Sequence, residues 1–349
     1  MKIASILPYK ENYTKNGSGA VSLWVSEFLR DSIYKKDTLI IGSTNNKNYL
    51  SKNYFNIKIN NINSKLSSTT KLYSNKIIKK IQNLNFDIIE LHNRPIMVKD
   101  FFQKINSKII LYFHNDPTSM KGAKSVEERM FLIKNVDKII FISKWVKNKF
   151  FENLPPLSDN KTQIIYHSID PINKNIKKLK QIIFVGKLNE SKGYDLYCES
   201  MFKILDKYRD WKAISIGEEK RFQQFPTHKR HFDLGQISHK KVLKHLSESA
   251  IAIIPSRWEE PFGRTALEAS SRGCATIISN NGGLPETTDY AIKLKILDTN
   301  NIEKETIKLI ENNKLRKDIQ RKSKNFVKHK LAINSQKIDL MRSSLFPFK

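Results

Sequence analysis

Short apolar runs rich in isoleucine, valine and phenylalanine alternate along the chain with longer stretches whose apolar residues repeat at helical spacing. In the first half, the runs that predict strands are Lys2–Pro8, Asp37–Ser43, Asp87–His92, Lys108–His114, Lys138–Ser143 and Gln163–Tyr166. Helices are expected between some of them, such as Val21–Ser32 and Lys71–Leu84. Buried strands separated by helices are typical of parallel sheets built from βαβ units, so this half predicts a doubly wound α/β domain.

A second set of the same kind follows a polar stretch. Residues 170–180, DPINKNIKKLK, have almost no apolar content, which is typical of a linker. Strands are then expected at Gln181–Gly186, Lys212–Gly217, Ile251–Pro255, Ala275–Ser279 and Ile292–Leu297, with helices such as Lys240–Glu248 and Arg264–Ser271. We therefore predict Rossmann-like domains over 1–169 and 181–322, joined by the linker over 170–180. Two such domains in series predict a cleft between the carboxyl ends of their sheets, where such folds bind ligands.

Length and composition agree with a folded two-domain protein. The 349 residues correspond to about two domains at ~150 residues each. No apolar run approaches the ~20 residues of a membrane-spanning helix, and Met1–Pro8 is too short for a signal peptide, so we expect a cytoplasmic chain. Cys198 and Cys274 lie far apart with no cysteine and histidine cluster at metal-ligand spacing, which predicts buried free thiols.

The net charge of +28 has two explanations. It suggests nucleic acid or an anionic membrane surface as a partner. However, only 12 of the 62 basic residues are arginine, and the lysines are spread along a chain rich in asparagine and isoleucine, as codon bias would produce. Nucleic-acid readers rely on arginine forks and interleaved aromatic residues, so we expect no nucleic-acid partner. An anionic membrane surface or a phosphorylated substrate stays open. The amphipathic stretch Lys71–Leu84 fits either a surface helix docked on its sheet or a face toward membrane or acceptor.

The most informative stretch is 251–286, IAIIPSRWEEPFGRTALEASSRGCATIISNNGGLPE. A strand ends at Pro255 and a helix opens near Gly263–Thr265, so its free backbone amides favour an anion such as a pyrophosphate. Glu268 lies one turn into that helix and can accept hydrogen bonds from a vicinal diol such as a ribose. Glu260 precedes the helix, where it would meet a group attached beyond the phosphates. The alternative is a capping box, Thr265-Ala-Leu-Glu268, in which Glu268 only caps its own helix.

Taken together, Glu-Pro-Phe-Gly at 260–263, the second glutamate after seven intervening residues and the GGLPE loop at 282–286 closely resemble the donor-site signature of retaining GT-B glycosyltransferases of the group 1 (family 4) type. The segment FVGKLNESKGYDL at 184–196 resembles the family's strand, loop and helix that carry two cations, here Lys187 and Lys192. The resemblance implies that these lysines neutralise a departing nucleotide diphosphate and that the donor is also held by Glu260, Phe262, Gly263, Arg264, Thr265 and Glu268.

The first domain carries weaker matches. NGSGA at 16–20 resembles the family's glycine loop beside the donor phosphate and the acceptor, which implies roles for Gly17 and Gly19. It is no full dinucleotide fingerprint, so a dehydrogenase is not supported. His114 matches a histidine of the family that contacts the transferred sugar, which we favour over the alternative of a polar residue that caps a strand. Arg94 fits either an acceptor phosphate or carboxylate, or an interdomain salt bridge.

The resemblance implies a GT-B fold whose last helix, at about Ser323–Met341, crosses back within 323–349 onto the first domain. It implies transfer with retention from a UDP- or GDP-linked sugar on the second domain to a glycan or lipid-linked acceptor on the first, without a metal or other cofactor. Glu260, His114 and Lys192 would be the catalytic residues. The implied setting is cell-envelope synthesis, of lipopolysaccharide or polysaccharide, in the cytoplasm or at the inner face of the membrane.

Two places depart from the family pattern, His167–Asp170 and Tyr290–Lys293. The second lies nearer the donor, so the donor's base and sugar stay open. Two rival functions also stay open, a non-catalytic GT-B-like binding protein and a basic nucleic-acid-associated protein on the same scaffold. A nucleotide-sugar epimerase or a phosphorylase has less support from these motifs.

Overall fold

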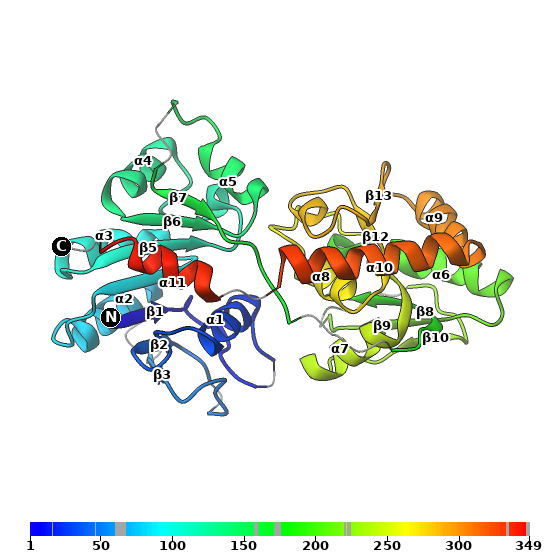
Figure 1. Ribbon diagram of the computed structural model, residues 1–349, viewed down its shortest axis with the longest axis horizontal. Helices are drawn as coiled ribbons and strands as arrows, with labels where there is room; N and C mark the ends of the chain where they lie inside the picture. The colour runs from blue at the N-terminus through cyan, green and yellow to red at the C-terminus, as the bar shows by residue number, and fades with distance from the viewer. Residues whose placement is uncertain are drawn as a thin grey trace. The chain divides into compact units, whose positions relative to one another are not determined.

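The computed structural model describes residues 1–15, 17–45, 47–59, 68–156, 160–170, 176–219, 221, 225–332 and 335–346. The chain divides into two compact units (Figure 1). The first contains Met1–His167 and Ile333–Lys349, and the second contains Ser168–Ala332. Each unit is built around one parallel sheet, so the predicted α/β class is confirmed.

The first unit has a seven-stranded sheet in the order β3-β2-β1-β4-β5-β6-β7. Its strands are β1 (Ile3–Ile6), β2 (Thr38–Gly42), β3 (Tyr54–Asn56), β4 (Ile88–His92), β5 (Lys108–Phe113), β6 (Lys138–Phe141) and β7 (Thr162–Ile164). Its helices before the crossing are α1 (Ala20–Arg30), α2 (Thr69–Ile81), α3 (Val98–Lys104), α4 (Val126–Asn135) and α5 (Lys144–Phe151). Strand β4 is buried at every position, as expected for a central parallel strand covered on both faces.

The second unit has a six-stranded sheet in the order β10-β9-β8-β11-β12-β13. Its strands are β8 (Leu179–Val185), β9 (Lys212–Ile216), β10 (His231–Asp233), β11 (Ser249–Ile254), β12 (Ala275–Ser279) and β13 (Ile292–Leu294). Its helices are α6 (Tyr194–Lys207), α7 (His239–Glu248), α8 (Arg264–Ser271), α9 (Thr299–Glu311) and α10 (Asn313–Lys330).

The end of the chain differs from the prediction of one helix over Ser323–Met341. Helix α10 packs on α8 and β12, so residues 323–330 belong to the second unit. The helix ends where Ile169 N donates a hydrogen bond to Leu331 O, at 3.1 Å, and Ile169 bridges to Ala332. A separate helix, α11 (Ser335–Ser343), contacts α1 and inserts Ile338 and Met341 into the first core. The crossing is therefore made by α11 alone.

The predicted linker over 170–180 also needs correction. Its residues 171–175 lie outside the described ranges, and β8 begins inside the predicted linker, at Leu179. Just before the strand, Lys178 Nζ donates to the carbonyls of Leu246 and Arg272, at 3.2 and 2.7 Å. Lys178 therefore anchors this segment to the second unit. Sequence composition alone indicated only that the segment is polar.

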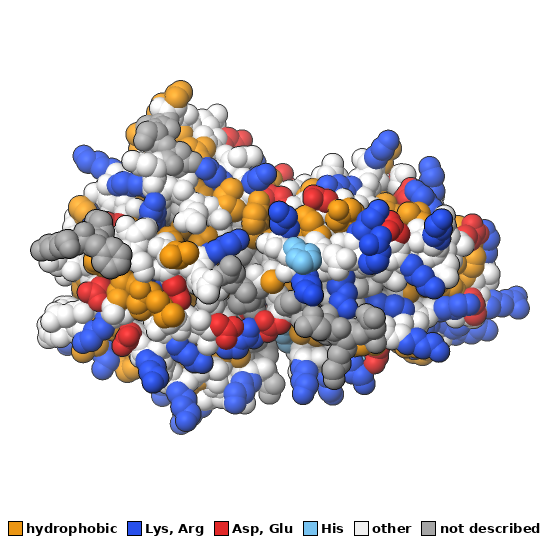
Figure 2. Space-filling view, viewed as in Figure 1, with side chains coloured by type: hydrophobic (Ala, Val, Ile, Leu, Met, Phe, Trp, Pro, Cys, Tyr) orange, Lys and Arg blue, Asp and Glu red, His pale blue; other side chains and the backbone are white. Residues whose placement is uncertain are grey.

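Helix α2 is docked on its sheet, because Tyr73, Ile77, Ile78 and Ile81 are all buried. The lysines of this helix stay largely outside, as the surface-helix interpretation requires. Lysine and arginine side chains are spread over the visible face in Figure 2 rather than gathered into one patch. In the described part of the chain, no helix combines the length and the apolar character that a membrane span requires. Both cysteines are buried and free, as predicted.

Candidate active site

Two loops at the carboxyl ends of β8 and β11 carry the predicted donor residues of the second unit, and the structure joins them. The backbone N–H groups of Arg257 and Trp258 both donate to Ser191 O, at 3.0 Å. Gly193 adopts a φ of +71°, and a Cβ at this position would lie 1.9 Å from Pro255 O. Only glycine permits this approach. The loop after β8 (residues 186–193) and the loop after β11 (residues 255–263) therefore pack together, and we call them the loop cluster.

Lys192 and Glu260 meet in this cluster. Lys192 Nζ lies 2.5 Å from Glu260 Oε1, and the two side chains are 21% and 15% exposed. The same ammonium group lies 4.1 Å from the centre of the Trp258 ring, which adds a cation–π contact. Lys187 is exposed on the preceding loop. Lys192 is thus paired with a carboxylate, whereas Lys187 is open to solvent.

Glu268 is held from two elements. Its Oε1 accepts hydrogen bonds from His239 Nε2 at 2.8 Å and from Arg264 Nε at 2.9 Å, and the residue is 4% exposed. Burial raises the pKa of Glu268, but the His239 hydrogen bond and the Arg264 charge outweigh burial and lower it below the ordinary value. The capping-box interpretation is wrong, because α8 begins at Arg264 and its N-cap is Gly263. Thr265 therefore lies within the first turn, where it is half-buried.

The GGLPE loop fixes the backbone around Glu260. Gly283 N donates to Glu260 O at 2.6 Å. Added Cβ atoms on Gly282 and Gly283 would lie 2.4 Å from Glu260 O and 2.3 Å from Pro261 O. Gly263 adopts a φ of +99°, which favours glycine, and a Cβ there would lie 2.3 Å from the Leu284 side chain. Phe262 is 1% exposed, so it supports this loop from within the packed interior instead of presenting its ring to solvent.

In the first unit, the glycine loop closes on the start of α1. Asn16 lies outside the described residues, but Asn12 Nδ2 donates to Gly17 O at 2.7 Å and Gly19 N donates to Asn12 O at 3.1 Å. Glu11 Oε1 accepts from Ser22 N at 3.1 Å and would lie 2.0 Å from a Cβ on Gly19. The Glu11 carboxylate therefore lies at the N-terminus of α1, beside the loop whose Gly17 and Gly19 are predicted to lie near the donor phosphate and the acceptor.

Arg94 and His114 lie at the carboxyl ends of β4 and β5. Arg94 Nη1 donates to Asn93 O at 2.9 Å; burial lowers the pKa of Arg94, and the Tyr73 and Glu11 charges oppose that shift. His114 is 4% exposed and its Nε2 lies 3.0 Å from His92 Nδ1. This histidine is thus part of a buried polar chain and not an isolated group at a strand end.

Sequence reasoning missed three residues at these sites, namely Glu11, Trp258 and His239. His239 carried the weakest signal, because it lies 29 positions from Glu268 on another helix. Trp258 could have been found, since it stands within the quoted motif. The signal for Glu11 is an acidic residue shortly before a helix that starts without a polar cap of its own.

Comparisons with known proteins agree with this description. Residues 167–326 match the family described as Glycosyl transferases group 1. The "Putative glycosyltransferase YtcC" of Bacillus subtilis is 26% identical over 263 residues, which cover 66% of this chain and 64% of that relative. The "Uncharacterized 41.2 kDa protein in cps region" of Klebsiella pneumoniae is 27% identical over 252 residues, covering 63% of this chain and 67% of the relative.

Solved structures share the fold across the whole chain. Anabaena Alr3699/HepE in complex with UDP-glucose has a TM-score of 0.75 at 13% identity, with 99% of both chains covered. WaaG, described as a glycosyltransferase involved in lipopolysaccharide biosynthesis, has a TM-score of 0.71 at 10% identity, with 99% of this chain and 100% of that chain covered. The chain therefore has the GT-B fold, and its second unit is similar to the group 1 glycosyltransferases.

Proposed function

We propose that this protein is a retaining glycosyltransferase that moves a sugar from a nucleotide diphosphate sugar to a glycan or lipid-linked acceptor. The observation that carries the proposal is the loop cluster of the second unit. This cluster holds Lys187 and Lys192, and Lys192 is paired with the Glu260 carboxylate. It also contains the N-terminus of α8, the helix that carries the buried Glu268. Cations and the backbone amides of a helix N-terminus suit a departing diphosphate, and carboxylates suit sugar and ribose hydroxyls.

Each group has a part in the proposed reaction. Lys187, Lys192 and the amides at 263–265 bind the diphosphate, Glu268 binds the ribose, and Glu260 orients the sugar hydroxyls. In a front-face displacement, the bond from the anomeric carbon to the phosphate oxygen breaks while the acceptor oxygen bonds to the same face of that carbon. The acceptor's proton passes to the departing phosphate. Glu260 holds the sugar from its far side and so does not attack the anomeric carbon.

The reaction requires Lys192 to exchange one anion for another. In the structure this lysine is paired with Glu260, at 2.5 Å. A bound diphosphate would compete for the ammonium group and leave the Glu260 carboxylate available to sugar hydroxyls. We propose that these cations do the work that a metal performs in other transferases, so that no metal is needed.

The donor and the setting follow by analogy with the relatives. The similar Anabaena structure contains UDP-glucose, which supports a UDP- or GDP-linked donor here. Relatives come from a cps region, and WaaG is described as acting in lipopolysaccharide biosynthesis, which supports an acceptor of the cell envelope. We propose that the protein works in the cytoplasm, peripherally at the inner face of the membrane.

Kinetics of three glutamate variants test the proposal. We expect Glu260→Ala to abolish transfer, and Glu268→Ala to weaken nucleotide binding about 10- to 150-fold, the value of a lost charge-assisted hydrogen bond. Glu259→Ala is the matched control, since Glu259 precedes Glu260 but is exposed, and it should behave as wild type. Small and equal effects of Glu260→Ala and Glu268→Ala on turnover would contradict the assignment.

A further inference from the structure

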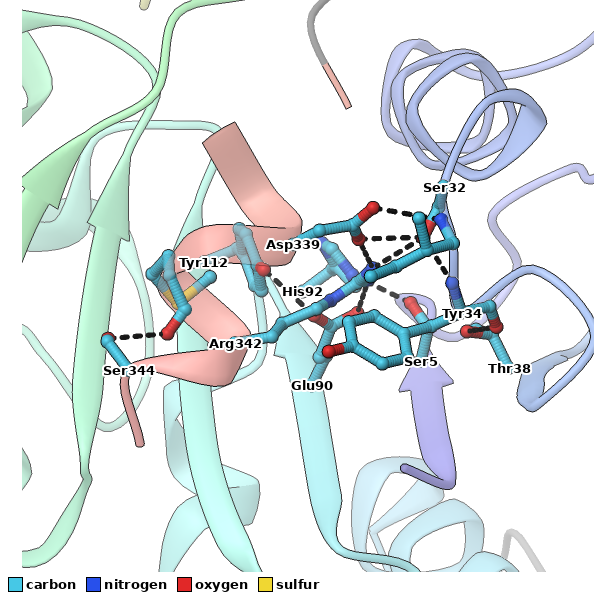
Figure 3. A network of polar contacts seen from close by, with 12 residues as sticks. Ser5, Ser32, Tyr34, Thr38, Glu90, His92, Tyr112, Asp339, Arg342 and Ser344 are labelled. Carbon is cyan, nitrogen blue, oxygen red and sulfur yellow. Dashed lines mark hydrogen bonds and ion pairs between the residues drawn. The ribbon is translucent and has the colours of Figure 1, made fainter. Parts of the chain in front are cut away.

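Three buried side chains form a hydrogen-bonded chain across neighbouring strands of the first sheet. Ser5 lies on β1, His92 ends β4, and His114 follows β5 directly. Ser5 Oγ lies 3.0 Å from His92 Nε2, and His92 Nδ1 lies 3.0 Å from His114 Nε2. Their exposed fractions are 1%, 0% and 4%. Figure 3 shows Ser5 and His92 within the larger polar network to which they belong.

The network surrounds the histidines with fixed partners. The Tyr112 ring stacks on His92, with centroids 4.5 Å apart and planes inclined by 20°. Tyr112 OH donates to Glu90 Oε1 at 2.9 Å, and Arg342 of α11 binds both oxygens of Glu90, at 2.8 and 3.0 Å (Figure 3). Trp24 of α1 packs edge-on against His114, at 5.2 Å between ring centroids. These contacts keep both imidazoles in one orientation.

The burial of the pair favours neutral rings. Burial lowers the pKa of His92 to about 3, and the Arg342 guanidinium contributes. Burial, with a contribution from His92, also lowers the pKa of His114. The charged groups of the packed elements are Glu90 on β4 and Asp339 and Arg342 on α11, and they already satisfy one another through ion pairs. Two further titratable rings lie beside His114 in the described part of the chain: His167, after β7, at 5.8 Å between centroids, and Tyr112 at 6.3 Å.

Hydrogen counting then selects one arrangement. A neutral imidazole has one N–H group and one lone pair, so one ring must donate to the other. If His92 Nδ1–H donates to His114 Nε2, then His92 Nε2 accepts the Ser5 hydroxyl hydrogen, and one polar atom of the chain, His114 Nδ1, is left without a partner among the described residues. In the opposite direction two polar groups are left without a partner among the described residues, namely the Ser5 hydroxyl hydrogen and the His114 Nδ1 lone pair. The first arrangement places the hydrogen of His114 on Nδ1, a buried atom with no hydrogen-bond partner within the described ranges.

We infer that Ser5 and His92 hold His114 as a neutral imidazole with its hydrogen on Nδ1. In the transferase, and thus resting on the proposed function, His114 gives a hydrogen bond to a substrate oxygen and does not act as an acid or a base. His92 and Ser5 are positioning residues, because they set which nitrogen of His114 carries the hydrogen.

Nitrogen NMR of the wild-type protein labelled with ¹⁵N-histidine tests the arrangement without any activity. The two ring nitrogens of a neutral imidazole resonate far apart, and long-range ¹H–¹⁵N correlations show which is protonated. We expect His92 and His114 both to be Nδ1–H tautomers, unchanged between pH 5 and pH 8. Hydrogen on Nε2 of His114, or titration of either ring in that range, would overturn the inference.

Variants at His92 test its positioning role. The amide of His92→Asn reaches the place of Nδ1 and can still donate to His114, whereas His92→Phe keeps the ring shape without any donor. We expect His92→Phe to lower kcat about 5- to 100-fold with the donor KM nearly unchanged, His92→Asn to restore most of that loss, and Ser5→Ala to fall between them. Circular dichroism confirms folding of each variant.

The outcomes separate this inference from the proposed function. A wild-type protein that transfers from no nucleotide sugar contradicts the proposed function, while the NMR result still decides the tautomer. A wild-type protein that transfers, with His92→Phe folded and equally active, contradicts the positioning role alone.

Discussion

At the scale of single residues, Glu268 is a buried carboxylate whose charge depends on two neighbours. His239 and Arg264 lower its pKa against the opposing effect of burial. A carboxylate whose pKa is lower in the folded state stabilises the fold above its unfolded pKa, and this stabilisation is lost as the pH falls through the folded value. We expect Glu268→Gln to have a lower free energy of unfolding than wild type at pH 7. This difference in stability should disappear as the pH falls below about 4.5.

Urea unfolding between pH 3 and pH 7 measures this dependence. Glu259→Gln is the control, because Glu259 is exposed and should shift stability little at any pH. A gap between wild type and Glu268→Gln that stays constant over the range would show that the carboxylate charge contributes nothing to stability.

The sequence signal of the candidate donor residues is local. Glu260 and Glu268 stand at fixed spacing in one stretch, and the structure places Lys192 against Glu260. The partners could not be predicted, because the fold brings them from distant positions. His239 reaches Glu268 from another helix, and His92 reaches His114 only because β4 and β5 are neighbours in the sheet. The order of the strands in the sheet decides which polar residues meet.

At the scale of elements, the GGLPE loop depends on close backbone approach. Gly282 has a φ of +59°, and a Cβ there would lie 2.4 Å from Glu260 O. Gly235 has the same φ of +59° but open space around its Cβ position. Alanine at either position carries the backbone strain, about 1 kcal/mol, so only Gly282→Ala adds a collision with backbone.

We therefore expect Gly282→Ala to lose clearly more free energy of unfolding than Gly235→Ala and to displace Glu260. Chemical unfolding measures the first effect, and nucleotide titration detects disturbance of the donor loop. Equal losses of unfolding free energy in Gly282→Ala and Gly235→Ala would mean that the GGLPE loop accommodates the added methyl group without further cost.

The last helix of the first unit is fixed by a buried ion pair. Arg342 and Glu90 are 7% and 2% exposed in their side chains, and Asp339 shares the guanidinium. Removing one partner leaves a buried charge uncompensated, so we expect Arg342→Met to cost about 3–5 kcal/mol of stability. Arg321→Met removes an exposed pair with Asp318 and should cost less than about 1 kcal/mol. Urea unfolding compares the two, and similar costs would contradict a structural role for the buried pair.

The central strands could be predicted from sequence because they are continuous apolar runs. Of the four edge strands, β7 and β13 were predicted, whereas β3 and β10 were not, because the sequences of these two strands, YFN and HFD, contain no continuous apolar run. The division between α10 and α11 was missed for a related reason. Helical periodicity continues through both, and the break depends on a backbone contact with Ile169, far away in sequence.

At the scale of the whole molecule, the net charge of +28 should make the protein surface attract anionic membranes. The apolar side of α2 is buried, which leaves its exposed lysines to interact electrostatically. We expect binding to phosphatidylglycerol vesicles, no binding to phosphatidylcholine vesicles, and release as salt shortens the screening length from about 10 Å at 0.1 M. Vesicle sedimentation measures this, and equal binding to both lipids would contradict an electrostatic attraction.

The most direct test of the central claim is thermal unfolding with UDP, GDP and ADP and their sugar conjugates, on wild type and Glu268→Ala. A ligand at about 100 times its dissociation constant adds about 2.7 kcal/mol of stability, which raises Tm by several degrees. We predict that one nucleotide diphosphate stabilises the wild type and not the variant. Stabilisation by none of them at any concentration would contradict the donor site and favour a GT-B-like protein that binds something else.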